Sequence, residues 1–204
     1  EYIFRVCFID PFQGSVMAKF GIETLKLKKA AVFKDIKSDY SVGLSKYFTE
    51  KWQSMGGTIV KEESYSAGDS DFKNQLTSIK SKGAETIFVP GYYTDVGLIA
   101  RQARELGITA VLMGGDGWDS DKLSEIGKDA IEGSFFSNHY SNQDQSPLVQ
   151  NFIKDFGVFH KLGEDKKADG MAAMGYDAAM VLFDSMKRAA SLKGDDLRKA
   201  IGET

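Results

Sequence analysis

The chain has 204 residues, enough for one large domain or two small ones. Hydrophobic residues make up 42% and charged residues 27%, a globular composition that argues against disorder. The 26 lysines and arginines against 29 aspartates and glutamates give a net charge of −3, which predicts no nucleic-acid partner. A single cysteine, Cys7, excludes an internal disulfide without determining the compartment.

Short apolar runs alternate with amphipathic helical runs as far as residue 140. Strands are predicted at residues 4–9, 30–33, 58–63, 86–89, 110–113 and 134–137. Helices are predicted between them, as where Leu44, Phe48, Trp52 and Met55 recur at helical spacing, and Asp71 is placed to cap the helix that follows it. This alternation predicts an α/β fold, a parallel sheet flanked by helices on both faces.

The pattern changes after residue 140. A polar connector at residues 141–147 is followed by predicted helices at about 148–162, 168–192 and 195–201, and by no further strand. The middle helix is apolar almost all round, as in a helix buried on most sides, and its apolar stretch at 171–183 is too short to span a bilayer. We expect residues 1–138 to form one α/β lobe and residues 139–204 to be helices of a second lobe.

The two ends of the chain indicate a fragment. The chain begins in a strand-like segment with neither an initiator methionine nor a signal sequence, and it stops in a helical pattern. We expect a longer protein whose sheet for the second lobe lies outside this chain. Helices 139–204 alone should then hide their apolar faces by docking on, or swapping with, another copy.

In an open parallel sheet, ligands bind beyond the carboxyl ends of the strands. The segments that follow the predicted strands are rich in Asp, Tyr, Trp and Gly and almost free of Lys and Arg, which suits phosphate poorly. They include residues 10–14, 35–41, 90–95, 114–119 and 138–140.

Motifs of common enzyme classes are absent from the sequence. It has no phosphate-binding loop, no dinucleotide fingerprint, and no H-E-x-x-H, C-x-x-C or G-x-S-x-G. Asp10, Asp35 and Asp116 could form a magnesium site for phosphoryl transfer, but the rim lacks the cation that such chemistry needs. We therefore predict no catalytic residue, no metal and no cofactor.

A binding cleft fits the rim better. A carboxylate at a strand end can hold an ammonium group, and tyrosine rings supply apolar walls and cation–π faces. Polar anchors with aromatic walls are the usual composition of a small-molecule pocket.

Six runs along the chain carry a resemblance. They are FRVCFID at 4–10, DYSVG at 39–43, AGDSDF at 67–72, PGYY at 90–93, RQARELG at 101–107 and GDGW at 115–118. Together they resemble the periplasmic substrate-binding proteins of branched-chain amino acid ABC transporters, the leucine/isoleucine/valine-binding family with the type I periplasmic-binding fold.

The resemblance implies two Rossmann-like lobes that close on an amino acid, a Venus flytrap, with a transporter permease as partner. It implies a periplasmic or extracytoplasmic location, with or without a lipid anchor on the full-length protein. By position, Asp116 resembles the family's acidic residue for the ligand ammonium, Tyr92 and Tyr40 the tyrosines that line the pocket, and Asp10 a hinge-side rim residue. The family's site for the ligand carboxylate lies on the first lobe, outside this chain.

Other interpretations stay open at the level of sequence. Asp116 stands in a Gly-Gly-Asp-Gly turn, where aspartate is common for local hydrogen bonding, and Tyr40 could pack on its own helix. The same fold could serve as the ligand-sensing domain of a receptor or regulator. A magnesium-dependent phosphotransfer enzyme is the third hypothesis.

Overall fold

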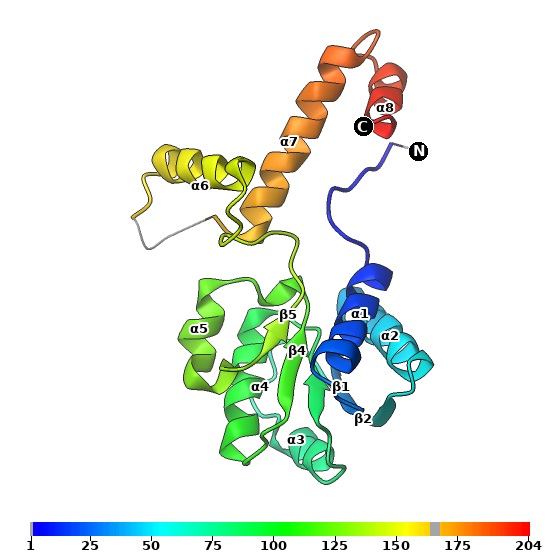
Figure 1. Ribbon diagram of the computed structural model, residues 1–204, viewed down its shortest axis with the longest axis vertical. Helices are drawn as coiled ribbons and strands as arrows, with labels where there is room; N and C mark the ends of the chain where they lie inside the picture. Colours follow the sequence, from blue (N-terminus) through cyan, green and yellow to red (C-terminus); the bar gives the residue numbers. More distant parts are fainter. Residues whose placement is uncertain (1, 164–167) are drawn as a thin grey trace. The chain divides into compact units, whose positions relative to one another are not determined.

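The computed structural model describes residues 2–163 and 168–204 (Figure 1). The chain divides into two compact units: a sheet unit, Phe8–Asn138, and a helical unit formed by Glu1–Cys7 and His139–Thr204. The chain therefore passes between the units twice, after Cys7 and after Asn138. The second passage coincides with the expected division, whereas residues 1–7 group with the helical unit instead of the sheet.

A five-stranded parallel sheet forms the centre of the sheet unit, with strand order β2-β1-β3-β4-β5. Its strands are β1 (Lys29–Asp35), β2 (Thr58–Tyr65), β3 (Thr86–Phe88), β4 (Val111–Gly114) and β5 (Phe135–Phe136). Five of the six predicted strands are thus confirmed, with ends that differ by a few residues.

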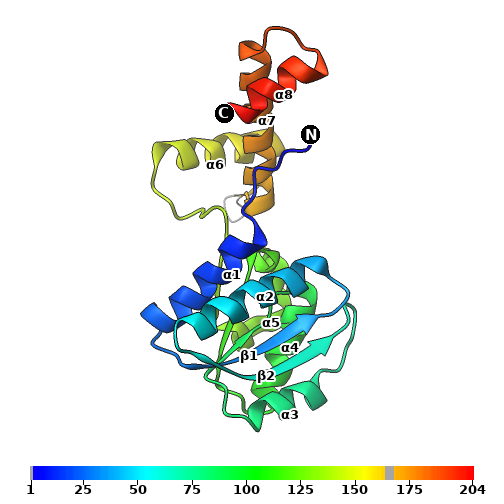
Figure 2. The same ribbon diagram turned by 90° about the vertical axis from the view of Figure 1, so that its right-hand side faces the viewer.

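Helices cover both faces of the sheet, which confirms the predicted α/β class (Figure 2). The helices are α1 (Asp10–Lys19), α2 (Asp39–Ser54), α3 (Lys73–Lys80), α4 (Tyr93–Glu105) and α5 (Asp121–Gly127), with short π or 3-10 turns η1 (Phe20–Thr24), η2 (Asp116–Trp118) and η3 (Lys128–Ile131). One apolar cluster joins α1 and α2 to the sheet, and another joins α3, α4 and α5 to it.

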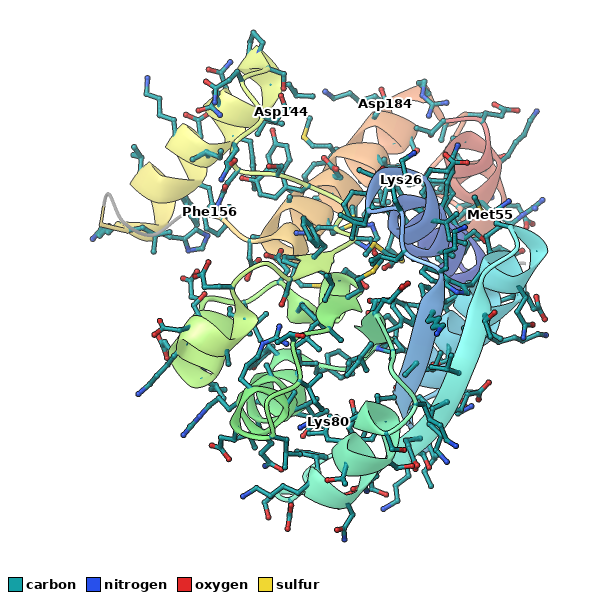
Figure 3. The ribbon with its side chains drawn as sticks, turned by 60° about the horizontal axis from the view of Figure 1, so that its bottom comes forward. Lys26, Met55, Lys80, Asp144, Phe156 and Asp184 are labelled. Carbon is teal, nitrogen blue, oxygen red and sulfur yellow. The ribbon has the colours of Figure 1, made fainter. Side chains whose placement is uncertain are left out.

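The predicted apolar face of α2 is the one that the helix buries. Leu44, Phe48 and Trp52 are fully buried, and the Phe48 ring stacks on Phe88 of β3 with centroids 4.0 Å apart. Met55 does not extend this face, because it is the residue at which the helix ends (Figure 3). At the start of α3 the capping position is occupied by Phe72 and not by Asp71 as predicted, while Asp71, one residue earlier, accepts a hydrogen bond from the Lys73 N–H at 3.0 Å.

The strand predicted at residues 4–9 is wrong. The segment has no regular secondary structure, and its apolar side chains are exposed, Phe4 by 47% and Ile9 by 49%. The helix α1 begins directly after it, where Asp10 stands in the first turn and Pro11 at a position that helix starts tolerate. Without a neighbouring strand among the described residues, the β-prone composition of this segment has no partner for a ladder.

The helical unit contains α6 (Pro147–His160), α7 (Gly170–Arg188) and α8 (Gly194–Gly202), close to the three predicted helices. Residues 164–167, which belong to the expected helical segment 139–204, lie outside the described residues. Asp169 caps α7 by accepting from the Ala172 N–H at 2.8 Å. Arg188 at the end of α7 donates to the Ala200 carbonyl at 3.0 Å, and Tyr2 donates to Asp195, so these contacts hold α8 and the N-terminal segment to the unit. None of the helices in the described ranges is long and apolar enough to cross a bilayer.

Candidate functional site

Three of the four predicted site residues meet at one edge of the sheet. Asp116 begins the turn η2 that follows β4, Tyr40 lies in the first turn of α2 after β1, and Tyr92 precedes α4 after β3. The Tyr40 hydroxyl donates to Asp116 Oδ1 at 2.9 Å. The rings of Tyr40 and Tyr92 lie with centroids 5.5 Å apart at 31°. Because β1, β3 and β4 are adjacent and parallel, their carboxyl ends bring these side chains together.

The Tyr40 hydroxyl also accepts a hydrogen bond, from the Gly117 N–H at 3.1 Å. Burial first, and then the negative charge of Asp116, raise the pKa of Tyr40 far above its ordinary value. The hydroxyl therefore keeps its proton at physiological pH and remains a donor to the carboxylate. This arrangement holds Asp116 in a defined orientation and links the turn after β4 to the start of α2.

The site has the chemistry of an ammonium acceptor with an aromatic wall. A carboxylate offers about four acceptor positions, so an ammonium donor can be accepted beside the tyrosine hydroxyl. Tyr92 is 49% exposed, and its ring can therefore contact a ligand. Nothing in this group is a nucleophile activated by a base, which is the minimum for covalent catalysis.

Asp10 is placed differently from the other three. It stands in the first turn of α1, and its carboxylate lies against Gly43 of α2, where an added Cβ would come within 2.6 Å of Asp10 Oδ2. The expectation that Asp10 follows a strand end is wrong, because no strand precedes it in the described structure.

The magnesium alternative lacks its ligand set. Asp35 is buried and accepts from the Lys37 N–H at 3.0 Å within its own turn. Among residues 2–163 and 168–204, no three His, Cys, Asp or Glu side chains are grouped so that they could hold a metal ion. Asp10, Asp35 and Asp116 therefore do not form one site.

Gln13 joins the group although the sequence did not single it out. This α1 residue is only 3% exposed, and its Nε2 donates to Asp116 Oδ1 at 3.0 Å. The predicted rim includes Gln13, but no pattern in the sequence connects it to a carboxylate 103 positions away. The fold alone identifies this contact.

The comparisons with known proteins agree on one family. The chain is 31% identical over 191 residues to Leu/Ile/Val-binding protein homolog 3 of Brucella melitensis, with 94% of this chain and 50% of that protein covered. The crystal structure of a leucine binding protein, LivK, from Thermotoga maritima matches with 40% identity and a TM-score of 0.89, over 96% of this chain and 55% of that one. The substrate-binding protein LivJ of a branched-chain amino acid transporter from Streptococcus pneumoniae, solved with isoleucine, matches with 29% identity and a TM-score of 0.85, over 97% and 55%.

The chain thus spans about half the length of the proteins that it matches. The family model described as periplasmic binding protein matches residues 1–204. Together with the parallel sheet flanked by helices and the similarity to LivK, this match over the full chain establishes that the chain belongs to the periplasmic binding protein family.

Proposed function

We propose that the protein is an extracytoplasmic solute-binding protein that captures an amino acid of branched-chain type and delivers it to the permease of an ABC transporter. The observation that carries this proposal is the Asp116 carboxylate, held by the Tyr40 hydroxyl at 2.9 Å beside the exposed Tyr92 ring. The relatives with printed ligands support it, because they are named for leucine, isoleucine and valine.

Each residue has a role in this proposal. Asp116 accepts the α-ammonium group, Tyr40 orients Asp116 and forms part of the wall, and Tyr92 contacts the side chain of the ligand. Asp10 supports the rim where α1 meets α2. Binding involves no covalent step, so the protein holds its ligand without transforming it.

The two units take the roles that the family implies. The sheet unit, residues 8–138, contributes the second ligand-binding lobe, and residues 139–204 of the helical unit are the helical return into the first lobe. Residues outside this chain would then hold the ligand carboxylate. Closure of the two lobes about a hinge would trap the ligand for delivery.

A thermal-shift screen of the full-length protein against the standard amino acids tests the function. We expect leucine, isoleucine or valine to raise the melting temperature, since a ligand at 100 times its Kd stabilises the folded state by about 2.7 kcal/mol. The corresponding acids without the α-amino group should give a much smaller shift, because they have no charge for Asp116. No response to any amino acid would contradict the proposal.

A second prediction concerns residues 1–204 expressed alone. Large apolar side chains of α6 and α7 are exposed, among them Leu148 by 80%, Phe159 by 81% and Met171 by 61%. We expect this segment to associate with itself, or to swap its helices, to cover that surface. Light scattering should show dimers or larger species, and Phe159→Glu should shift the distribution towards monomer. A monomer at all concentrations would refute the prediction.

A further inference from the structure

We propose that Gln13 is a positioning residue of the ligand site, which fixes the Asp116 carboxylate and ties it to the segment through which the chain leaves the sheet unit. This inference rests on the proposed function, because it assigns Gln13 a part in amino acid binding through Asp116.

Both polar atoms of the Gln13 side-chain amide are hydrogen-bonded to neighbours. Its Nε2 donates to Asp116 Oδ1 at 3.0 Å, while its Oε1 accepts from the Ser137 hydroxyl at 2.9 Å and from the Asp116 N–H at 3.4 Å. The Asp116 N–H can only donate and the Asp116 carboxylate can only accept, so the amide oxygen of Gln13 faces the N–H and its NH2 group faces the carboxylate. The Ser137 hydroxyl donates to the amide oxygen in this orientation and so helps to hold Gln13 in place.

The helix that carries Gln13, α1, packs tightly against α2. The next residue, Gly14, packs against the backbone of α2 so closely that an added Cβ would lie 2.8 Å from both the Leu44 carbonyl oxygen and the Phe48 nitrogen. The helix α1 therefore rests on α2, the helix that also carries Tyr40. The two donors to Asp116 Oδ1, Gln13 and Tyr40, come from helices whose separation is fixed by this contact.

Gln13 stands shortly after the first place where the chain passes between its units, and its partner Ser137 stands next to the second. The sheet unit begins at Phe8, just before α1, and ends at Asn138, directly after Ser137. Gln13 thus connects the carboxylate to both passages within the sheet unit. A change of conformation at Ser137 would therefore alter the position of Asp116 through the Gln13 side chain, which bonds to both.

A buried glutamine could instead serve stability alone, and a double-mutant cycle separates the two roles. We would measure L-leucine binding to the full-length protein by calorimetry for Gln13→Met, Asp116→Ala and the pair. Gln13→Met should weaken binding about tenfold, because a hydrogen bond to a charged group is lost. In the Asp116→Ala background the same change should have no further effect, since the carboxylate that Gln13 positions is gone.

Gln102→Met is the matched control. Gln102 also bridges two groups, accepting from the Phe72 N–H at 2.7 Å and donating to the Ser70 carbonyl at 2.8 Å, and none of these residues belongs to the ligand site. It should lower stability and leave the Kd for L-leucine unchanged. Ser137→Ala gives a milder variant in case Gln13→Met fails to fold: we expect binding about threefold weaker, because only one of the hydrogen bonds that hold Gln13 is removed.

The outcomes separate the inference from the function on which it rests. Wild-type protein that does not bind L-leucine, or Asp116→Ala protein that binds it normally, would overturn both. If Asp116→Ala weakens binding but Gln13→Met or Ser137→Ala alone leaves binding normal, the role of Gln13 is overturned and the role of Asp116 stands. An equal loss from Gln13→Met with and without Asp116 would also overturn it, because the residue would then act only through stability.

Discussion

Replacing Asp116 with alanine is expected to weaken L-leucine binding to the full-length protein about a hundredfold, or roughly 2.7 kcal/mol. The substitution removes the charged acceptor for the ligand ammonium, and ion-paired hydrogen bonds are the strong ones. It also leaves the Tyr40 hydroxyl and the Gln13 amide without the oxygen to which both now donate. Titration calorimetry gives the ratio of dissociation constants directly.

The control for this substitution is Asp121→Ala, which removes a carboxylate from an exposed position at the start of α5. It makes the net charge less negative by the same amount, so a general electrostatic effect would appear in both variants. We expect its Kd to stay at the wild-type value. Asp116→Ala protein that binds as tightly as the Asp121→Ala control would disprove the ammonium-acceptor role.

Replacing Gly91 with alanine is expected to destabilise the fold by about 2–3 kcal/mol and to weaken ligand binding, because overpacking forces buried groups apart. An added Cβ at this position would lie 2.1 Å from the Tyr65 hydroxyl oxygen. Tyr65 is 3% exposed, and its ring packs edge-on against Phe33 and Phe72, so it has no room to move away. The strain would fall on the segment that carries Tyr92.

The same geometry supplies a rescue. In Tyr65→Phe the nearest atom to the new methyl group would be the ring carbon, 3.4 Å away, which is an ordinary contact. The Tyr65 hydroxyl is buried without a hydrogen-bond partner among the described residues, so its removal alone should cost little stability. Urea unfolding of Gly91→Ala, Tyr65→Phe and the double variant tests this. A loss from Gly91→Ala that persists undiminished beside Tyr65→Phe would show that the hydroxyl is not the obstacle.

The sequence predicted the sheet well where strands are buried on both faces. Ala30, Val32 and Phe88, all without exposed surface, lie in short apolar runs that only a covered parallel sheet explains. It predicted a helix before β1 only through the alternation of strands and helices, because the face that α1 buries consists of Gln13, Gly14, Met17 and Ala18. With a glutamine and a glycine among them, these residues do not form a continuous apolar stripe, so helical periodicity gives no signal there.

The candidate site was predicted from topology and resemblance together. The rule that parallel strands gather their carboxyl ends at one edge brings Tyr40, Tyr92 and Asp116 together, as the structure has them. The roles assigned to them come from the family resemblance and remain proposals. Gln13 could not be identified in the same way, since its contact depends on how α1 packs against α2, which no local pattern encodes.

The shortness of β5 has a mechanical consequence. This strand pairs with β4 at two positions only, and the Ser137 N–H adds one further bond to the Gly114 carbonyl at 3.3 Å. A force applied to the chain beyond Asn138 would break these few hydrogen bonds before it reached the longer pairing of β1 with β2. Under tension the end of the sheet unit can therefore separate from β4 while the rest of the sheet stays intact.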